Sequence, residues 1–261
     1  MSTPVKQPSI ADLTAKVVAW GQDAEMLSAA ADALGQVEPH EMTVGLRTDP
    51  RTAWGEAMEA LGGDSEKLKG LTLPGEWGRL VVRQQSVAAL PFALGNYPQQ
   101  VRELDSLVKA EDLSALLASD PTAGETPKGL AEWCRKQADA GTMPQALIAA
   151  AMHRVSRDYP AAERVLTDLA GKVPFEWLTT LENERAALLW ERGHHVAARA
   201  AWDKLPDTNP VVFNRGMAAL FAGEAQAAVN HFRKLDGQLP EDSAWRHLAG
   251  LYLALAELRA S

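Results

Sequence analysis

The sequence has little of several features that would assign it to particular protein classes. Only one cysteine, Cys134, occurs among 261 residues, so no disulfide can form within the chain, and a reducing compartment is expected. Residues 1–9 lack the apolar core of a signal peptide. No run reaches the ~20 apolar residues of a membrane-spanning helix. We therefore expect a cytoplasmic protein without a membrane segment.

Positive charge is also scarce. Lys and Arg number 26 against 34 Asp and Glu, which gives a formal net charge of −8 at pH 7. Nucleic acids and anionic membrane surfaces attract clustered Lys and Arg. The chain has no basic run, so we expect neither nucleic acid nor a membrane as its partner.

Catalytic and metal-binding motifs are missing as well. His194 and His195 are adjacent, and adjacent side chains point apart on a helix, which is poor geometry for one metal ion. Glu191 lies nearby, but Glu-Arg-Gly-His-His is not the His-Glu-x-x-His motif of metalloproteases. No glycine loop for phosphate and no nucleophile elbow occurs. Free cysteines are usually buried, so we expect Cys134 to pack as a small apolar side chain in the core. We expect no catalytic residue, no metal and no cofactor.

Strand patterns are absent, and apolar positions recur at helical spacing instead. In the first part of the chain these helical patterns show no clear repeat, and Pro91 is expected to end or kink one of them. Pro, Gly and small polar residues cluster over residues 119–128, as in a linker, and Thr126-Pro127 then starts a new helix that ends at Gly141. We predict a less regular helical region over residues 1–120, with possible degenerate repeats, and a separate domain over residues 126–261.

A strict pattern begins at Pro144. Three units share a step of four residues and then one of eight: Ala162, Leu166 and Pro174; Ala198, Trp202 and Pro210; Ala228, Phe232 and Pro240. A small residue lets two helices approach within about 8–10 Å, and the large residue one turn later fills the gap to the next unit. We expect each proline to end the helix before it. The matching small residues of the preceding helices are Ala150, Ala186 and Gly216, and Gly193 and Gly223 form the turns.

This pattern, over residues 144–252, resembles the tetratricopeptide repeat. The resemblance implies an all-α fold, an α-solenoid of antiparallel helix pairs, with residues 245–258 as a terminal capping helix. The chain departs from the family pattern in places. Arg157 replaces the turn glycine of the first unit, and His153, Leu189 and Ala219 replace the usual tyrosine.

In that family the first helices of the repeats line a concave groove that usually binds a peptide or helix of another protein. Mapped by repeat phase, the residues that face this groove are Leu147, Ala151, Arg154, Asn183, Ala187, Trp190, Phe213, Met217, Leu220 and Phe221. Most are apolar, which argues against the carboxylate-binding pattern of the chaperone-binding members. We therefore expect a non-catalytic scaffold or adaptor that binds a peptide or amphipathic helix, and the sequence leaves its oligomeric state open.

Two questions stay open at this level. An apolar groove needs a cover, and either the N-terminal region or a partner's helix supplies it. The function has alternatives too: a self-assembling structural component, or, less favoured, an enzyme or enzyme accessory subunit with a site between the two halves.

Overall fold

The computed structural model describes residues 89–96, 123–240 and 243–261. The helices expected before residue 89 and between residues 97 and 122 lie outside these described residues. Within the three described ranges the chain forms α-helices and one short 3₁₀ helix, with no strand. The all-α prediction is therefore confirmed for this part of the chain.

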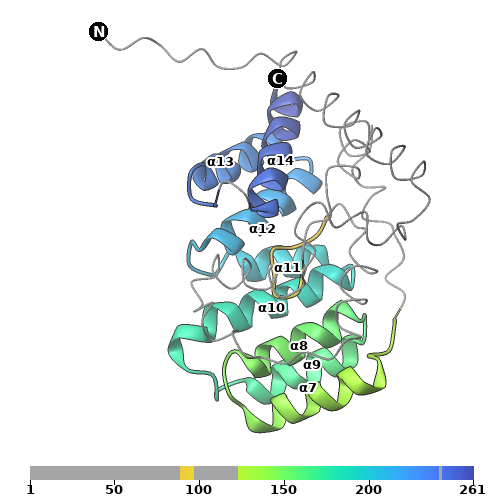
Figure 1. Cartoon of the computed structure of the whole chain (residues 1–261). Helices are drawn as coiled ribbons and strands as arrows, with labels where there is room; N and C mark the ends of the chain where they lie inside the picture. The colour runs from red at the N-terminus through yellow and green to blue at the C-terminus, as the bar shows by residue number, and fades with distance from the viewer. Residues whose placement is uncertain (1–88, 97–122, 241–242) are drawn as a thin grey trace, which may run out of the picture.

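The helices follow one another with short connections (Figure 1). In chain order they are α7 (Lys128–Ala140), α8 (Gln145–Val155), α9 (Tyr159–Leu169), the 3₁₀ helix η3 (Phe175–Trp177), α10 (Leu178–Glu191), α11 (His195–Trp202), α12 (Asn209–Phe221), α13 (Ala225–Leu235) and α14 (Ala244–Ala260). Helices that are adjacent in the chain pack together: α7 on α8, α8 on α9, α10 on α11, α12 on α13, and α13 on α14. Helix α7 starts after Pro127 and ends at Ala140 with Gly141 as its C-cap, as expected from the sequence.

The same turn joins α8 to α9, α10 to α11, and α12 to α13. In each, one backbone N–H reaches back three residues and the next reaches back five: Gly193 to Trp190 and His194 to Leu189, Gly223 to Leu220 and Glu224 to Ala219, Arg157 to Arg154 and Asp158 to His153. This pair of hydrogen bonds closes a helix when one residue adopts left-handed backbone angles. Gly193 and Gly223 have φ of 82° and 80°, and Arg157 has φ of 62°. The turn positions predicted from the sequence are confirmed.

The small residues of the repeat pattern lie at helix contacts. Ala162, Ala198 and Ala228 are helical and fully buried, and the large residues one turn later, Leu166, Trp202 and Phe232, are buried beside them. Gly216 of α12 faces the Phe232 ring, and a Cβ at residue 216 would lie 2.9 Å from Phe232 Cζ. The predicted burial of these residues is confirmed.

The prediction that the repeat prolines end helices is wrong. Helix α9 ends at Leu169, before Pro174, and Pro174 precedes η3 instead. Pro210 lies in the first turn of α12, and α13 ends at Leu235, ahead of Pro240. A proline has no N–H, and the first turn of a helix leaves that group unpaired in any case. Pro174 and Pro210 therefore suit the start of the next element.

Two clusters of buried apolar side chains form the core. The first joins residues of α10 to α14, and the second joins residues of α7 to α10 with η3. Residues 89–96 contribute to both, with Phe92 in the first cluster and Leu94 in the second. This short piece, drawn in yellow in Figure 1, crosses the middle helices. Residues 89–96, from the N-terminal side of the chain, thus share the core of the described helices.

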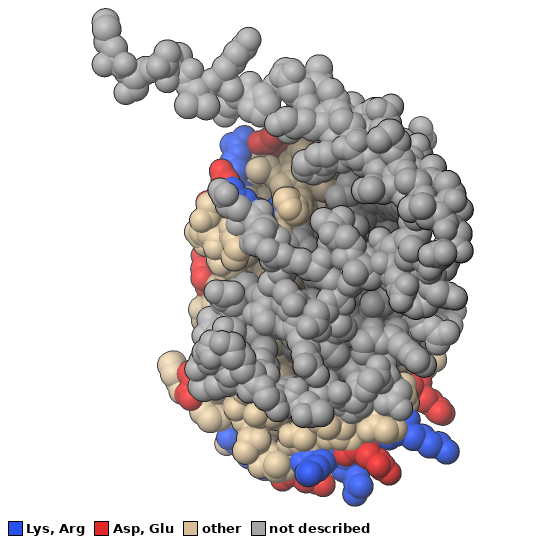
Figure 2. All heavy atoms as spheres, viewed as in Figure 1, with Lys and Arg blue, Asp and Glu red and all other residues tan. Residues whose placement is uncertain are grey.

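Charged side chains that are visible in Figure 2 lie around the margin of the described helices, with Lys and Arg next to Asp and Glu. Arg192 pairs with Glu163 at 2.9 Å, and Arg233 pairs with Glu257 at 2.7 Å. Such exposed pairs contribute little to stability, about 0–1 kcal/mol each. Among the described residues, no helix combines the length and the apolar character needed to cross a membrane.

Candidate functional site

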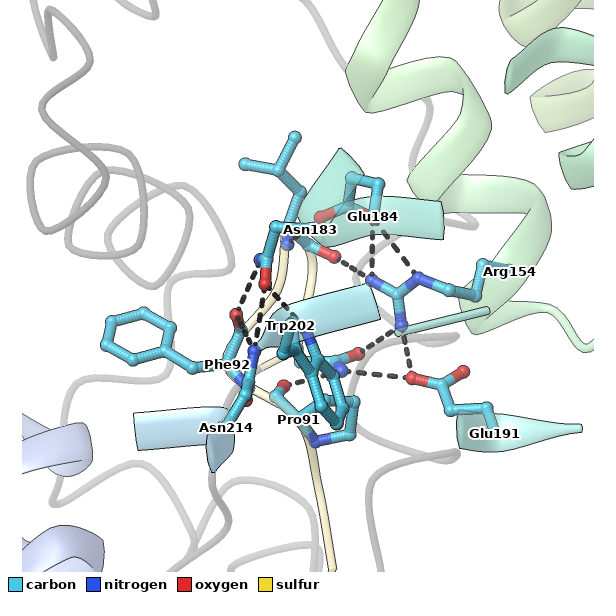
Figure 3. A network of polar contacts seen from close by, with 10 residues as sticks. Pro91, Phe92, Arg154, Asn183, Glu184, Glu191, Trp202 and Asn214 are labelled. Atoms are coloured by element: carbon cyan, nitrogen blue, oxygen red, sulfur yellow. Dashed lines mark hydrogen bonds and ion pairs between the residues drawn. The ribbon is translucent and has the colours of Figure 1, made fainter. Parts of the chain in front are cut away.

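Residues 89–96 lie against side chains from α8, α10, α12 and α14, and we call this contact surface the inner face. It comprises Arg154 of α8, Asn183, Glu184 and Trp190 of α10, Phe213 and Asn214 of α12, and Trp245 of α14. All eight residues of the segment are buried, and none is helical or in a strand. Figure 3 shows the polar part of this contact.

Two asparagines hold the main chain of Phe92. The Phe92 N–H donates to Asn214 Oδ1 at 2.6 Å. The Phe92 carbonyl accepts from Asn183 Nδ2 at 2.9 Å and from Asn214 Nδ2 at 3.2 Å. Asn183 Oδ1 in turn accepts from Trp202 Nε1 at 3.0 Å, which orients its amide. Both main-chain polar groups of Phe92 are thus paired with side chains of α10 and α12.

An acid and a base hold the main chain of Leu94 in a similar way. The Leu94 N–H donates to Glu184 Oε1 at 2.5 Å, and the Leu94 carbonyl accepts from Arg154. Arg154 also contacts Glu184 Oε2 at 3.2 Å and pairs with Glu191. Trp190 Nε1 adds a third main-chain contact, to the Ala89 carbonyl, at 2.8 Å. Side chains from three helices therefore bind the segment through its backbone.

The segment ends in a turn that Asn96 closes. The Asn96 N–H donates to the Ala93 carbonyl at 3.2 Å, and Gly95 has φ of 74°, a region that side-chain-bearing residues rarely adopt. Asn96 Nδ2 donates to the Pro91 carbonyl at 2.9 Å and to Glu191 Oε1 at 3.0 Å. Its Oδ1 accepts from Arg154 at 3.0 Å. Asn96 thus connects the turn to the charged residues of the inner face.

Two sockets receive the large side chains. The Phe92 ring stacks on Trp245, with ring centroids 4.0 Å apart and planes 8° apart, and meets Phe213 edge-on at 5.8 Å. Such aromatic pairs add about 0.5–1.5 kcal/mol beyond the burial of their surface. Leu94 is fully buried in the second core cluster, together with Leu147 of α8 and Leu188 of α10. The two anchors therefore enter different parts of the core.

The charges at the inner face are matched among themselves. Arg154 is 1% exposed and lies between Glu184, which is fully buried, and Glu191. Burial raises the pKa of Glu184 to about 7, although the Arg154 guanidinium acts in the opposite direction. A buried arginine without carboxylates would be very costly, so these acids allow Arg154 to bind a neutral carbonyl.

The structure places each residue that the sequence assigned to the groove. Arg154, Asn183 and Trp190 hydrogen-bond to the segment, and Phe213 contacts the Phe92 ring. The apolar members Leu147, Ala151, Ala187, Met217, Leu220 and Phe221 are all buried in the core. The sequence left open whether the N-terminal region or a partner's helix covers the groove. Residues 89–96 belong to the N-terminal region, and they cover the inner face where they lie.

Sequence reasoning missed Glu184, Asn214, Glu191 and Trp245, and it missed the segment itself. Glu184 and Asn214 directly follow the assigned Asn183 and Phe213 in the chain. Repeat phase assigned only the first residue of each pair to the groove. Polar residues are usually exposed, which hid their role. The one available signal was the apolar stretch from Ala89 to Leu94, interrupted by Pro91 and followed by Gly95, which suits neither a helix nor a surface loop.

A second polar cluster joins Thr126, His153 and Asp158. Thr126 Oγ1 lies 2.6 Å from His153 Nδ1 and donates to Asp158 Oδ2 at 3.2 Å. A hydrolytic triad needs one histidine nitrogen on the hydroxyl and the other on the carboxylate. Here the hydroxyl and the carboxylate are on the same side, since His153 Nδ1 is also the atom 3.8 Å from Asp158. Asp158 caps α9, so the cluster attaches the loop before α7 to that helix end.

Among the described residues, no group of three or more His, Cys, Asp and Glu side chains is arranged to hold a metal ion. Cys134 is buried, and burial raises the pKa of its thiol to about 12. Comparisons with protein-family models, with curated proteins and with solved structures gave no match to this chain. The geometry of the inner face is therefore the main guide to function.

Proposed function

We propose that this chain is a non-catalytic protein–protein interaction scaffold, a tetratricopeptide-like α-solenoid of antiparallel helix pairs. Its inner face binds a short segment of a partner protein. One observation supports this above all. The backbones of Phe92 and Leu94, two residues apart, are each bound at N–H and carbonyl by side chains of α8, α10 and α12.

This arrangement is typical of peptide recognition. Buried backbone groups inside a domain are mostly paired within helices and sheets, where the backbone supplies both partners. The backbones of Phe92 and Leu94 are paired with side chains instead, and Asn214 is 122 positions away from Phe92. Backbone contacts give affinity for any peptide, while side-chain sockets select among peptides. The inner face has both elements.

The test uses selection from a displayed library of random 12-residue peptides. The bait is the immobilised full chain, used both as the wild type and as a Phe92→Asp/Leu94→Asp variant. We call this double variant the released variant, because its residues 89–96 cannot bury the side chains at positions 92 and 94. Selected peptides should lose at least tenfold in affinity when Asn214→Leu is added, because the backbone then loses one acceptor and one donor. Circular dichroism checks that each bait is helical.

The matched control is Asn230→Leu, the same change at an exposed position of α13. It should leave the affinity of the selected peptides within twofold. Failure of both baits to enrich any peptide, or equal binding to the Asn214→Leu bait, would contradict the proposal.

A further inference from the structure

We infer that residues 89–96 are an internal ligand, and that the partner displaces them with a segment of the same chemistry. That segment is an uncharged turn with a buried aromatic residue, an aliphatic residue two positions later, then glycine and asparagine. This inference rests on the proposed function and adds to it the chemical class of the ligand and the competitor that the ligand must replace.

The spacing of the anchors follows from the sockets. Trp245 and Phe213 enclose a planar ring at Phe92, whereas the socket of Leu94 lies in the other core cluster. The backbone between them is held at both ends, so a ligand needs the same two-residue separation. A glycine must follow the aliphatic residue because φ at Gly95 is 74°.

The matched charges exclude an acidic ligand. Arg154 is already paired with Glu184 and Glu191, so it offers a hydrogen bond but no unbalanced positive charge. Asn96 gives its amide hydrogens to Glu191 Oε1 and the Pro91 carbonyl. An aspartate at that position would lose both donations and place a third carboxylate beside Glu191. A free C-terminal carboxylate at this point of the ligand is disfavoured for the same reason.

Competition follows from the chain connection. A tethered ligand is present at an effective concentration on the order of millimolar. A free peptide of equal intrinsic affinity therefore binds the wild type much more weakly than a chain whose own segment is released. The partner gains access by binding more tightly than residues 89–96, by a local concentration of its own, or by both.

The first experiment measures binding of a fluorescent peptide with the sequence of residues 89–96, blocked at both ends, to the released variant of the full chain. The peptide should bind the released variant at least tenfold more tightly than the wild type. Versions with alanine at the Phe92 position, or aspartate at the Asn96 position, should each bind at least tenfold more weakly than the parent peptide. If the released variant unfolds, added parent peptide should restore its helical circular dichroism, and the alanine version should not.

The second experiment uses the wild type and needs no variant. Hydrogen exchange with mass spectrometry follows the Phe92 and Leu94 amides, which donate to Asn214 and Glu184. Excess parent peptide should increase exchange in residues 89–96 in a dose-dependent way, and a peptide with the same residues in scrambled order should not.

The outcomes separate this inference from the proposed function. If library peptides bind the released variant and depend on Asn214, but lack the aromatic–aliphatic spacing or leave residues 89–96 of the wild type protected, the internal-ligand inference is wrong and the proposed function stands. If neither the parent peptide nor any library peptide binds, the segment is part of the folding core and both proposals fail.

Discussion

At the scale of single residues, Arg157 shows that the backbone of a turn can be kept when its usual residue is lost. Arg157 occupies the position that Gly193 and Gly223 fill in the other two units, with the same backbone bonds and a left-handed φ of 62°. A residue with a Cβ pays about 1–2 kcal/mol for this conformation, whereas glycine adopts it freely. The tertiary structure of the surrounding helices must therefore impose the turn.

Replacing Arg157 by glycine should stabilise the protein. The removed backbone strain outweighs the greater entropy of glycine in the unfolded chain, for a net gain of about 0.5–1 kcal/mol. The reverse change, Gly193→Ala, should cost about 1 kcal/mol, because φ is 82° and no atom crowds a Cβ there. Urea unfolding followed by circular dichroism measures both. A loss of stability in Arg157→Gly would show that the arginine side chain contributes more than its backbone costs.

At the scale of elements, the contact between α12 and α13 depends on a glycine facing an aromatic ring. Gly216 is buried against Phe232, whereas Gly250 of α14 is exposed and has no atom within 4 Å of a Cβ position. Both glycines lie inside helices, where alanine is favoured by about 1 kcal/mol. The two sites therefore separate intrinsic helix preference from helix packing.

The same substitution should have opposite effects at these two positions. Gly250→Ala should stabilise by about 0.5–1 kcal/mol through helix preference alone. Gly216→Ala should destabilise by about 1 kcal/mol, since the cost of pushing back the Phe232 ring, about 1–3 kcal/mol, exceeds that preference. Thermal unfolding by calorimetry compares the two variants with the wild type. Higher thermal stability of Gly216→Ala than of the wild type would mean that the α12–α13 contact relaxes without cost.

The elements were largely predictable, and their ends were less so. Apolar spacing located the helix pairs and their small residues, because helix packing depends on residue size at fixed intervals. The prolines were misassigned because proline is compatible with the residue after one helix and with the first turn of the next. Pro210, for example, lies in the first turn of α12. Spacing alone does not distinguish the two positions.

At the scale of the whole molecule, Glu184 titrates in an environment that no single element creates. Its carboxylate lies on α10, contacts Arg154 of α8 and accepts the N–H of Leu94 from the distant segment. Burial raises its pKa from 4.5 to about 7, although the Arg154 guanidinium and the Leu94 N–H act in the opposite direction. The folded protein therefore binds a proton more readily than the unfolded chain between these pH values.

Glu184 should make the folded state less stable as pH rises. Its contribution is fully present below pH 4.5 and is lost as pH rises through about 7. Relative to Glu184→Gln, which does not titrate, wild-type stability should fall by on the order of 2 kcal/mol between pH 5 and pH 7.5. Urea unfolding at the two pH values measures this difference. Glu182→Gln, on the same helix with its side chain 43% exposed, is the control and should follow the wild type. If the stability difference between the wild type and Glu184→Gln is the same at both pH values, the raised pKa of Glu184 is contradicted.

The sequence by itself determined the helical class of the described residues and the positions of the helix pairs from α8 to α13. These follow from local periodicity and residue size, which act over a few turns of helix. Only the tertiary structure decided that residues 89–96 fill the inner face and that Glu184 and Asn214 bind their backbone. Those contacts join positions 90 to 122 residues apart, and hydrogen bonds from side chains to backbone leave no periodic pattern in a sequence.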